Sequence, residues 1–120
     1  MTRILVAEDN PTNMELALEI LRSMGFVVRG AKDGNIALMM AEKESYDVVV
    51  LDIEMPGKNG VEVLNILRSM PKYRDVPAIA LTAYAMKGDK ERFLEAGFNM
   101  YFPKPLDVVE FMRAMEKYKD

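Results

Sequence analysis

The feature that most constrains the fold is an unbroken aliphatic run, residues 48–51, that ends at Asp52. Four aliphatic residues in succession indicate a strand buried on both faces, as in a parallel sheet covered by helices. A carboxylate is costly inside a core, so we expect Asp52 to emerge at the carboxyl end of this strand. Ligands of open α/β sheets bind outside that edge, which makes Asp52 the first candidate functional residue.

Short apolar runs alternate with amphipathic helical patterns along the whole chain. Five of these runs are expected to form strands: residues 4–7, 26–28, 48–51, 78–81 and 100–102. Strict alternation indicates a parallel sheet with helices on both faces, and right-handed crossovers leave few topologies. The sequence therefore predicts a single α/β domain over residues 1–120 with a doubly wound (βα)5 fold. Among the remaining topologies we choose the flavodoxin-like strand order 2-1-3-4-5.

The last two helices carry the most specific local predictions. The fourth lies between Gly88 and Gly97, is highly charged at its start, and has only Phe93, Leu94 and Ala96 as an apolar face. Such few anchors indicate low local stability, as expected of an element that moves. The fifth is predicted to begin with a capping box formed by Asp107 and Glu110.

The chain contains neither cysteine nor histidine, and the absence of these two limits its chemistry. Without cysteine, disulfides and thiolate sites are excluded, which fits a cytoplasmic protein. Without histidine, the usual general base and zinc ligand are missing too. No apolar run approaches the length of a membrane span, and the first residues enter a strand without a secretory signal pattern. A net charge of -3 gives no indication of nucleic-acid binding.

Polar side chains follow four of the five predicted strands. Glu8 and Asp9 follow the first, Asp52 the third, Thr82 the fourth and Lys104 the fifth. These strands are neighbours in the predicted order, so their side chains should converge at one edge of the sheet. Each residue alone has an ordinary explanation, such as a turn, a helix cap or a surface lysine. Their joint placement on one edge is what indicates a site.

Three carboxylates brought together need cations nearby. Lys104 supplies one positive charge, and a divalent metal ion would supply the rest. Oxygen ligands without imidazole or thiolate favour Mg²⁺, which Mn²⁺ can replace, over zinc. Because Mg²⁺ commonly binds phosphate and an aspartate can form an acyl phosphate, the constellation predicts a phosphoryl-transfer site with Asp52 as the nucleophile.

Four short segments, taken together, resemble one known family. They are Ile4-Leu5-Val6-Ala7-Glu8-Asp9-Asn10, Leu51-Asp52-Ile53-Glu54-Met55-Pro56 with Gly60, Leu81-Thr82-Ala83, and Tyr101-Phe102-Pro103-Lys104-Pro105. In this register the chain resembles, over essentially its whole length, the receiver domain of bacterial two-component response regulators, including the chemotaxis regulator. Residues 81–89 are most similar to single-domain receivers of the cell-cycle type and to the receivers of hybrid kinases.

The resemblance implies a phospho-acceptor and a set of metal ligands. Asp52 matches the aspartate that accepts the phosphoryl group. Glu8 and Asp9 match the acidic pair that helps to hold Mg²⁺, and of the two we expect Asp9 to bind the ion directly. Asp52 and the backbone carbonyl of Glu54 complete the set of ligands. The family consists of signalling domains rather than enzymes, and self-phosphorylation and slow self-dephosphorylation are expected.

The resemblance also implies a conformational switch. Thr82 matches the hydroxyl that turns toward the phosphoryl group, and Lys104 matches the lysine that pairs with a phosphoryl oxygen. Tyr101 matches the aromatic residue that packs inward when Thr82 moves. Ala83 is small where the donor approaches, and a cis peptide bond is expected before Pro105. The face formed by the fourth helix, fifth strand and fifth helix is expected to change and to control partner binding.

The expected partners follow from the same resemblance. A histidine kinase or histidine phosphotransfer protein would donate the phosphoryl group, because this chain has no histidine. A downstream effector protein would bind the switched face, and no direct contact with nucleic acid or membrane is expected. The chain is expected to act as a stand-alone receiver, either as a monomer or as a weak phosphorylation-dependent dimer.

Three other functions stay open at this point. A Mg²⁺-dependent phosphatase of the haloacid-dehalogenase type also uses Asp, Thr and Lys, but its D-x-D motif belongs on the first strand. A flavodoxin-like flavin binder needs a phosphate loop after the first strand, where this chain has Glu8 and Asp9. A pseudo-receiver would keep the fold as an interaction module, and the intact Asp, Thr and Lys set argues against it.

Overall fold

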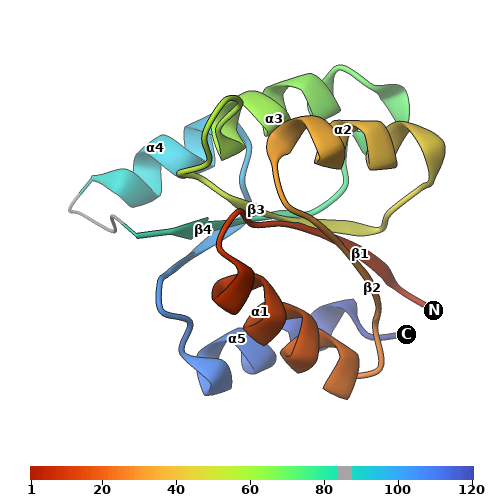
Figure 1. The fold of residues 1–120 in the computed structure, drawn as a ribbon, viewed down its shortest axis with the longest axis vertical. Coiled ribbons are helices and arrows are strands. Elements are labelled where there is room, and N and C mark those ends of the chain that lie inside the picture. Colours follow the sequence, from red (N-terminus) through yellow and green to blue (C-terminus); the bar gives the residue numbers. More distant parts are fainter. Residues whose placement is uncertain (84–87) are drawn as a thin grey trace.

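Five parallel strands form one sheet in the computed structural model, which describes residues 1–83 and 88–120 (Figure 1). The strands are β1 (Arg3–Ala7), β2 (Val27–Ala31), β3 (Val48–Asp52), β4 (Ala78–Thr82) and β5 (Met100–Pro103). They lie in the order β2-β1-β3-β4-β5, and every neighbouring pair is parallel. The predicted α/β class and strand order are therefore confirmed.

Helices cover both faces of this sheet. The helices α1 (Pro11–Ser23) and α5 (Val108–Met115) lie on one face, and α2 (Gly34–Lys43), α3 (Gly60–Arg68) and α4 (Asp89–Ala96) lie on the other (Figure 1). Short 3-10 helices, Pro71–Tyr73 and Glu116–Tyr118, follow α3 and α5. Within residues 1–83 and 88–120, no helix is both long enough and apolar enough to cross a membrane.

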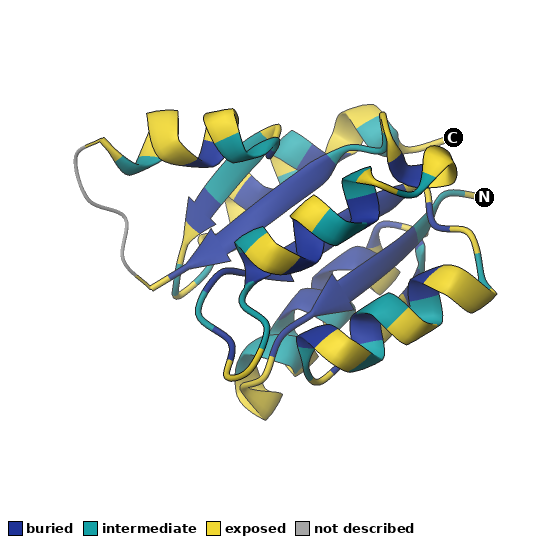
Figure 2. Cartoon of the chain, turned by 90° about the horizontal axis from the view of Figure 1, so that it is seen from above, coloured by how far each residue is buried: buried dark blue, intermediate teal, exposed yellow. Residues whose placement is uncertain are grey.

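The central strand β3 explains why its sequence is a continuous aliphatic run. Val48 and Val50 pack into the core beneath α1 and α5, whereas Val49 and Leu51 pack into the core beneath α2, α3 and α4. All residues of β3 are buried, and the exposed surface lies mainly on the outer sides of the helices (Figure 2). Because both faces of the sheet are covered, the polar residues that follow the strands can reach solvent only at its ends.

The edge strand β2 extends further than the sequence pattern indicates. The sequence predicts this strand over residues 26–28, with Arg29 and Gly30 trailing off its end. In the structure it begins at Val27, and its pairing with β1 continues through both residues to Ala31. An edge strand tolerates the exposed Arg29 side chain. Gly30 fits because α1 passes close by, where a Cβ would lie 2.9 Å from the Met14 sulfur.

The helix α4 has an even narrower apolar face than the sequence predicts. Phe93 is buried and Ala96 is half-buried, but Leu94 is 47% exposed, so the expectation that it packs inward is wrong. Leu94 follows Phe93 by one residue and therefore points about 100° away around the helix, beyond the line of contact with the sheet. Residues 84–87, which belong to the segment that resembles cell-cycle receivers, lie outside the described residues.

Side-chain caps fix the helix starts that border the site. Asn10 caps α1, and a reciprocal capping box joins Asn59 and Glu62 at the start of α3. At α5 the prediction is only half right. Asp107 Oδ1 accepts from the Glu110 amide at 3.0 Å, but among the described residues the Glu110 carboxylate accepts no bond from the Asp107 amide in return. The full box therefore lies at α3, where the sequence analysis did not place one.

Candidate functional site

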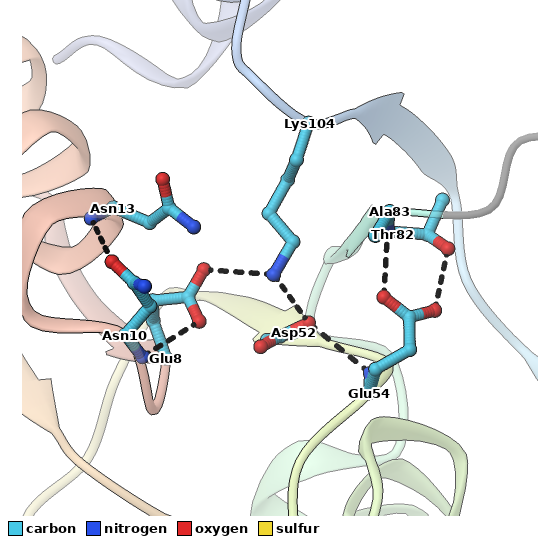
Figure 3. A network of polar contacts seen from close by, with 8 residues as sticks. All are labelled: Glu8, Asn10, Asn13, Asp52, Glu54, Thr82, Ala83 and Lys104. Atoms are coloured by element: carbon cyan, nitrogen blue, oxygen red, sulfur yellow. Dashed lines mark hydrogen bonds and ion pairs between the residues drawn. The ribbon is translucent and has the colours of Figure 1, made fainter.

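The carboxyl ends of β1, β3 and β5 bring four charged side chains together (Figure 3 labels three of them). Carboxylate oxygens of Glu8, Asp9 and Asp52 lie within 4.8 Å of one another. The Lys104 ammonium lies 2.9 Å from Asp52 Oδ1 and 3.2 Å from Glu8 Oε1. Thr82, at the end of β4, is the fifth member of the predicted set and lies beside Glu54, which follows Asp52 by two residues.

Several of these groups are deeply buried, which is costly for charges. Glu8, Asp52 and Thr82 are at most 1% exposed, and the Lys104 side chain is 13% exposed. Asp9, in contrast, is exposed. Buried charges are retained only where partners compensate for the lost solvation, so the partners of each oxygen matter.

The two buried carboxylates differ in how well their oxygens are satisfied. Glu8 Oε1 is paired with Lys104 and Oε2 accepts from the Asn10 amide at 3.2 Å. Asp52 Oδ1 is paired with Lys104 and accepts from the Glu54 amide at 3.1 Å. Asp52 Oδ2 is buried and accepts no hydrogen bond from any residue that the structure describes. This oxygen therefore lacks a compensating donor among the described residues.

The pKa values of the clustered groups also indicate that the site lacks positive charge. Burial raises the pKa of Asp52 to about 8, and its contact with Glu8 raises it as well, while Lys104 acts in the opposite direction. Partial desolvation acts to raise the pKa of Asp9, but its close contacts with Asp52 and Glu8, together with the charge of Lys104, outweigh it and lower that pKa. Burial lowers the pKa of Lys104, and the contacts with Asp52 and Glu8 more than reverse this. The cluster thus holds a proton near neutral pH unless another cation replaces it.

A divalent metal ion fits this donor set. The three carboxylates offer hard oxygen ligands, and no imidazole or thiolate is available in the chain. Such ligands suit Mg²⁺ or Mn²⁺. The orphaned Asp52 Oδ2 is the atom that most clearly requires a cation. The cofactor expected from the sequence is therefore compatible with the residues present.

The loop after β3 is built tightly around Asp52. A Cβ on Gly60 would lie 2.5 Å from the Asp52 carbonyl oxygen, so only glycine lets α3 begin at this position. The Gly60 amide donates to the Ile53 carbonyl at 3.1 Å, which closes the loop. The short loop and the helix that follows it thus hold the Asp52 backbone in a fixed place.

The far side of the site is fixed by β4 and β5. The Lys104 amide donates to the Thr82 carbonyl at 2.8 Å, and Thr82 pairs with Pro103 in the sheet. The peptide bond between Lys104 and Pro105 is cis, as the sequence analysis expected. The Lys104 side chain extends from the end of β5 to Asp52 (Figure 3).

One interaction in the site was missed from the sequence. The Glu54 carboxylate accepts from the Thr82 hydroxyl at 2.6 Å and from the Ala83 amide at 2.7 Å (Figure 3). From the sequence, only the backbone carbonyl of Glu54 is expected to take part in the site. The strand register is the signal that could have found it: Asp52 pairs with Leu81, and Glu54 and Ala83 both lie two residues beyond this pair.

The predicted switch residue Tyr101 lies apart from the acidic cluster, toward α4. Its ring is half-buried and contacts Phe93, with the ring centroids 5.7 Å apart. Tyr101 also lines an open groove of about 610 Å³ between α4, β5 and α5, together with Lys90, Leu94, Pro103, Glu110 and Ala114. Tyr101 therefore connects the sheet to the face that was expected to change.

Comparisons with known proteins agree with this geometry. Residues 4–116 match the model of the response regulator receiver domain family. The polar-differentiation response regulator DivK of Brucella anthropi is 34% identical over 115 residues, which cover 96% of this chain and 94% of the relative.

Solved structures show the same similarity. One similar structure is the receiver domain of the sensor histidine kinase PA1611 from Pseudomonas aeruginosa, which was solved with a magnesium ion coordinated in its active-site cleft. Its sequence is 38% identical to this chain, and its TM-score is 0.87. The match covers 98% of this chain and 96% of that one. The chemotaxis protein CheY4 of Vibrio cholerae is 25% identical, with a TM-score of 0.91 and 98% coverage of both chains. Fold, motifs and comparisons lead to one conclusion: the chain belongs to the response regulator receiver domain family of two-component systems.

Proposed function

We propose that this protein is a phosphorylation switch in which Asp52 accepts a phosphoryl group from a phosphohistidine on a histidine kinase or histidine phosphotransfer protein. The observation that supports this most strongly is Asp52 itself, a buried carboxylate with Lys104 on Oδ1 and no partner for Oδ2 among the described residues. A purely structural carboxylate would be fully satisfied at this depth.

The transfer requires Asp52 to be ionised and correctly aimed. An Asp52 oxygen would attack phosphorus, a phosphorus–oxygen bond would form, and the phosphorus–nitrogen bond to the donor imidazole would break. The donor imidazole keeps the electron pair and takes up a proton. Lys104 favours the ionised carboxylate, and the Glu54 amide holds Oδ1 in place. Such a reaction depends on positioning and charge neutralisation more than on acid–base catalysis.

The proposed metal ligands are Glu8, Asp9, Asp52 and the backbone carbonyl of Glu54. The bound Mg²⁺, or Mn²⁺ in its place, would neutralise negative charge on the phosphoryl oxygens. The three side chains of this set already lie close enough together to share one ion. Lys104 is paired with Asp52 Oδ1, and from this position it would pair with a phosphoryl oxygen.

The proposed output is a change in the face formed by α4, β5 and α5. The phosphoryl group would draw the Thr82 hydroxyl and Lys104 toward it, and Tyr101 would follow Thr82 by shifting its ring. Tyr101 is suited to this role because its ring contacts Phe93 of α4 and lines the groove beside α5. An effector protein binding this groove would therefore distinguish the two states.

The same proposal covers the setting in which the protein works. Residues 1–120 would act as one receiver domain in the cytoplasm, through protein–protein contacts and without binding nucleic acid. The described site takes its side chains from one chain, so the transfer needs only a monomer. A weak dimer, if phosphorylation produces one, would belong to the output step.

Intact-protein mass spectrometry tests the proposal. The wild type and an Asp52→Asn variant would be incubated with Mg²⁺ and acetyl phosphate, with and without EDTA. We expect only the wild type to gain the mass of one phosphoryl group, and only in the samples without EDTA, where Mg²⁺ is available to the protein. An equal gain in Asp52→Asn would contradict the assignment of the acceptor. If the wild type binds Mg²⁺ but takes up neither phosphoryl nor beryllofluoride, the protein is a pseudo-receiver.

A further inference from the structure

The Glu54 side chain binds two hydrogen-bond donors at the end of β4. One oxygen accepts from the Thr82 hydroxyl at 2.6 Å and the other accepts from the Ala83 amide at 2.7 Å. Figure 3 shows the carboxylate bridging the two residues, on the side of Asp52 away from Glu8. Bonds to a carboxylate that are this short are charge-assisted and stronger than neutral ones.

The strand register fixes this contact. Asp52 pairs with Leu81 across β3 and β4, so Glu54 and Ala83 leave the two strands side by side. The Glu54 amide is also bound to Asp52 Oδ1, at 3.1 Å. Glu54 therefore touches the proposed acceptor through its backbone and the proposed switch residue through its side chain.

We propose that Glu54 is a latch that holds the protein in its unphosphorylated state. Its carboxylate occupies the Thr82 hydroxyl and the Ala83 amide, the two donors that the end of β4 would offer to a phosphoryl group on Asp52. This inference rests on the proposed function, since a latch has meaning only if Asp52 is phosphorylated. Glu54 would act as a positioning residue: it holds Thr82 and takes no part in the chemical step.

Glu54 can act as a latch because the Thr82 hydroxyl and the Ala83 amide have few hydrogens to donate. A hydroxyl and an amide each have one hydrogen to donate, so neither can fully serve the Glu54 carboxylate and a phosphoryl oxygen at once. Phosphorylation would add charge beside the carboxylate, and the two anions would repel each other. The switch therefore has to break two short hydrogen bonds, and their strength sets how rarely the active arrangement forms without phosphorylation.

Loss of a nearby negative charge could also favour an anion on Asp52, so the variants must separate contact from charge. Glu54→Gln removes the charge and keeps the length of the side chain. Glu54→Asp keeps the charge but shortens the side chain by one methylene, so the carboxylate no longer reaches the Thr82 hydroxyl and the Ala83 amide. Glu62→Gln is the matched control, because it removes the same charge from a side chain that bonds to Asn59 instead, and glutamine also completes a capping box.

The first measurement needs no phosphoryl group. In NMR spectra of the unphosphorylated protein, we expect the Ala83 amide proton to resonate downfield in the wild type and in Glu62→Gln. It should move upfield and exchange faster with solvent in Glu54→Asp and Glu54→Gln. An Ala83 amide that is the same in all four proteins would overturn the latch, whatever Asp52 does.

The second measurement is the affinity of the four proteins for beryllofluoride, a phosphoryl mimic, in the presence of Mg²⁺. We expect both Glu54 variants to bind it at least roughly tenfold more tightly, the factor that corresponds to one net hydrogen bond to a charged group. Tighter binding by Glu54→Gln alone would show that charge is responsible and would overturn the latch. Equal affinities in all four proteins would also overturn it, whereas a wild type that binds no beryllofluoride would overturn the proposed function.

Discussion

Lys104 Nζ lies 2.9 Å from Asp52 Oδ1, and this ion pair joins the end of β5 to the end of β3 across the intervening strand β4. The Asp52 side chain is inaccessible to solvent and the Lys104 side chain nearly so. Lys104 is also paired with Glu8 at 3.2 Å. One lysine thus serves two buried carboxylates, which is why the site is short of positive charge.

Replacing Lys104 by methionine should destabilise the protein most at high pH. The variant leaves Glu8 and Asp52 without their buried cation, and removing one partner of a buried ion pair costs about 3–5 kcal/mol when the other stays charged. At low pH the carboxylates take up protons and the loss shrinks. Urea unfolding without metal, at several pH values, measures this. The exposed Lys90 supplies the control Lys90→Met, and a loss that does not vary with pH would contradict the account.

The pKa of Asp52 gives stability a definite pH dependence in the absence of metal. This pKa is raised from 3.8 to about 8 on folding, so between these values the folded state holds a proton that the unfolded state has released. The contribution of Asp52 to stability is therefore fully present below the lower value and is lost as the pH rises through the upper one. In Asp52→Asn this fall in stability with pH should become smaller.

At alkaline pH the same variant should be more stable than the wild type by about 1–3 kcal/mol, because it no longer buries an unsatisfied charge. Urea unfolding in EDTA, for both proteins over the same pH range, gives the two curves. Parallel curves would show that Asp52 is ionised in both the folded and the unfolded states across this range.

Mg²⁺ should stabilise the wild type and bind more tightly as the pH rises. The ion replaces the proton held by the acidic cluster, so binding competes with protonation of Asp52. At a hundred times its dissociation constant the ion should add about 2.7 kcal/mol to the free energy of unfolding. Thermal unfolding with Mg²⁺ or EDTA measures the difference. Asp9→Asn should abolish it and the exposed Glu95→Gln should keep it; a full effect in Asp9→Asn would rule out Asp9 as a ligand.

Tyr101→Ala should separate phosphorylation from its output. Asp52 should still bind beryllofluoride, since Tyr101 lies apart from the acidic cluster. The shifts that beryllofluoride causes in the backbone amides of α4, followed by NMR at Phe93 and its neighbours, should largely disappear, because the ring that touches Phe93 is gone. Tyr118→Ala, on the opposite side of the sheet, serves as the control. Unchanged α4 shifts in Tyr101→Ala would exclude Tyr101 from the switch.

The sequence predicted the sheet and the acidic cluster well because both depend on short-range patterns. The apolar run at residues 48–51 identified a strand buried on both faces. Strict alternation of strands and helices left few strand orders, and the flavodoxin-like order was the choice among them. Once that order is given, the residues after each strand must meet at one edge. Glu8, Asp9, Asp52 and Lys104 do so.

Features that depend on side-chain direction could not be predicted. Leu94 is exposed because only one narrow stripe of α4, the one that carries Phe93, faces the sheet. The composition of the helix does not show which of its apolar residues lie on that stripe. The Arg68 guanidinium donates to the backbone carbonyls of Tyr73, Val76 and Gly97, and no sequence pattern marks such a contact. The Glu54 side chain was missed for a different reason: its contact with Ala83 depends on the register of two strands.

Chemical mapping of the phosphorylated residue tests the central claim most directly. The protein would be phosphorylated with Mg²⁺ and acetyl phosphate and then treated with borohydride, which reduces an acyl phosphate to an alcohol and leaves a free carboxylate unchanged. Peptide mass spectrometry then locates the reduced residue. The account predicts homoserine in place of Asp52, with Glu8, Asp9 and Glu54 unchanged. Reduction at another carboxylate, or none in a protein shown to carry a phosphoryl group, would contradict it.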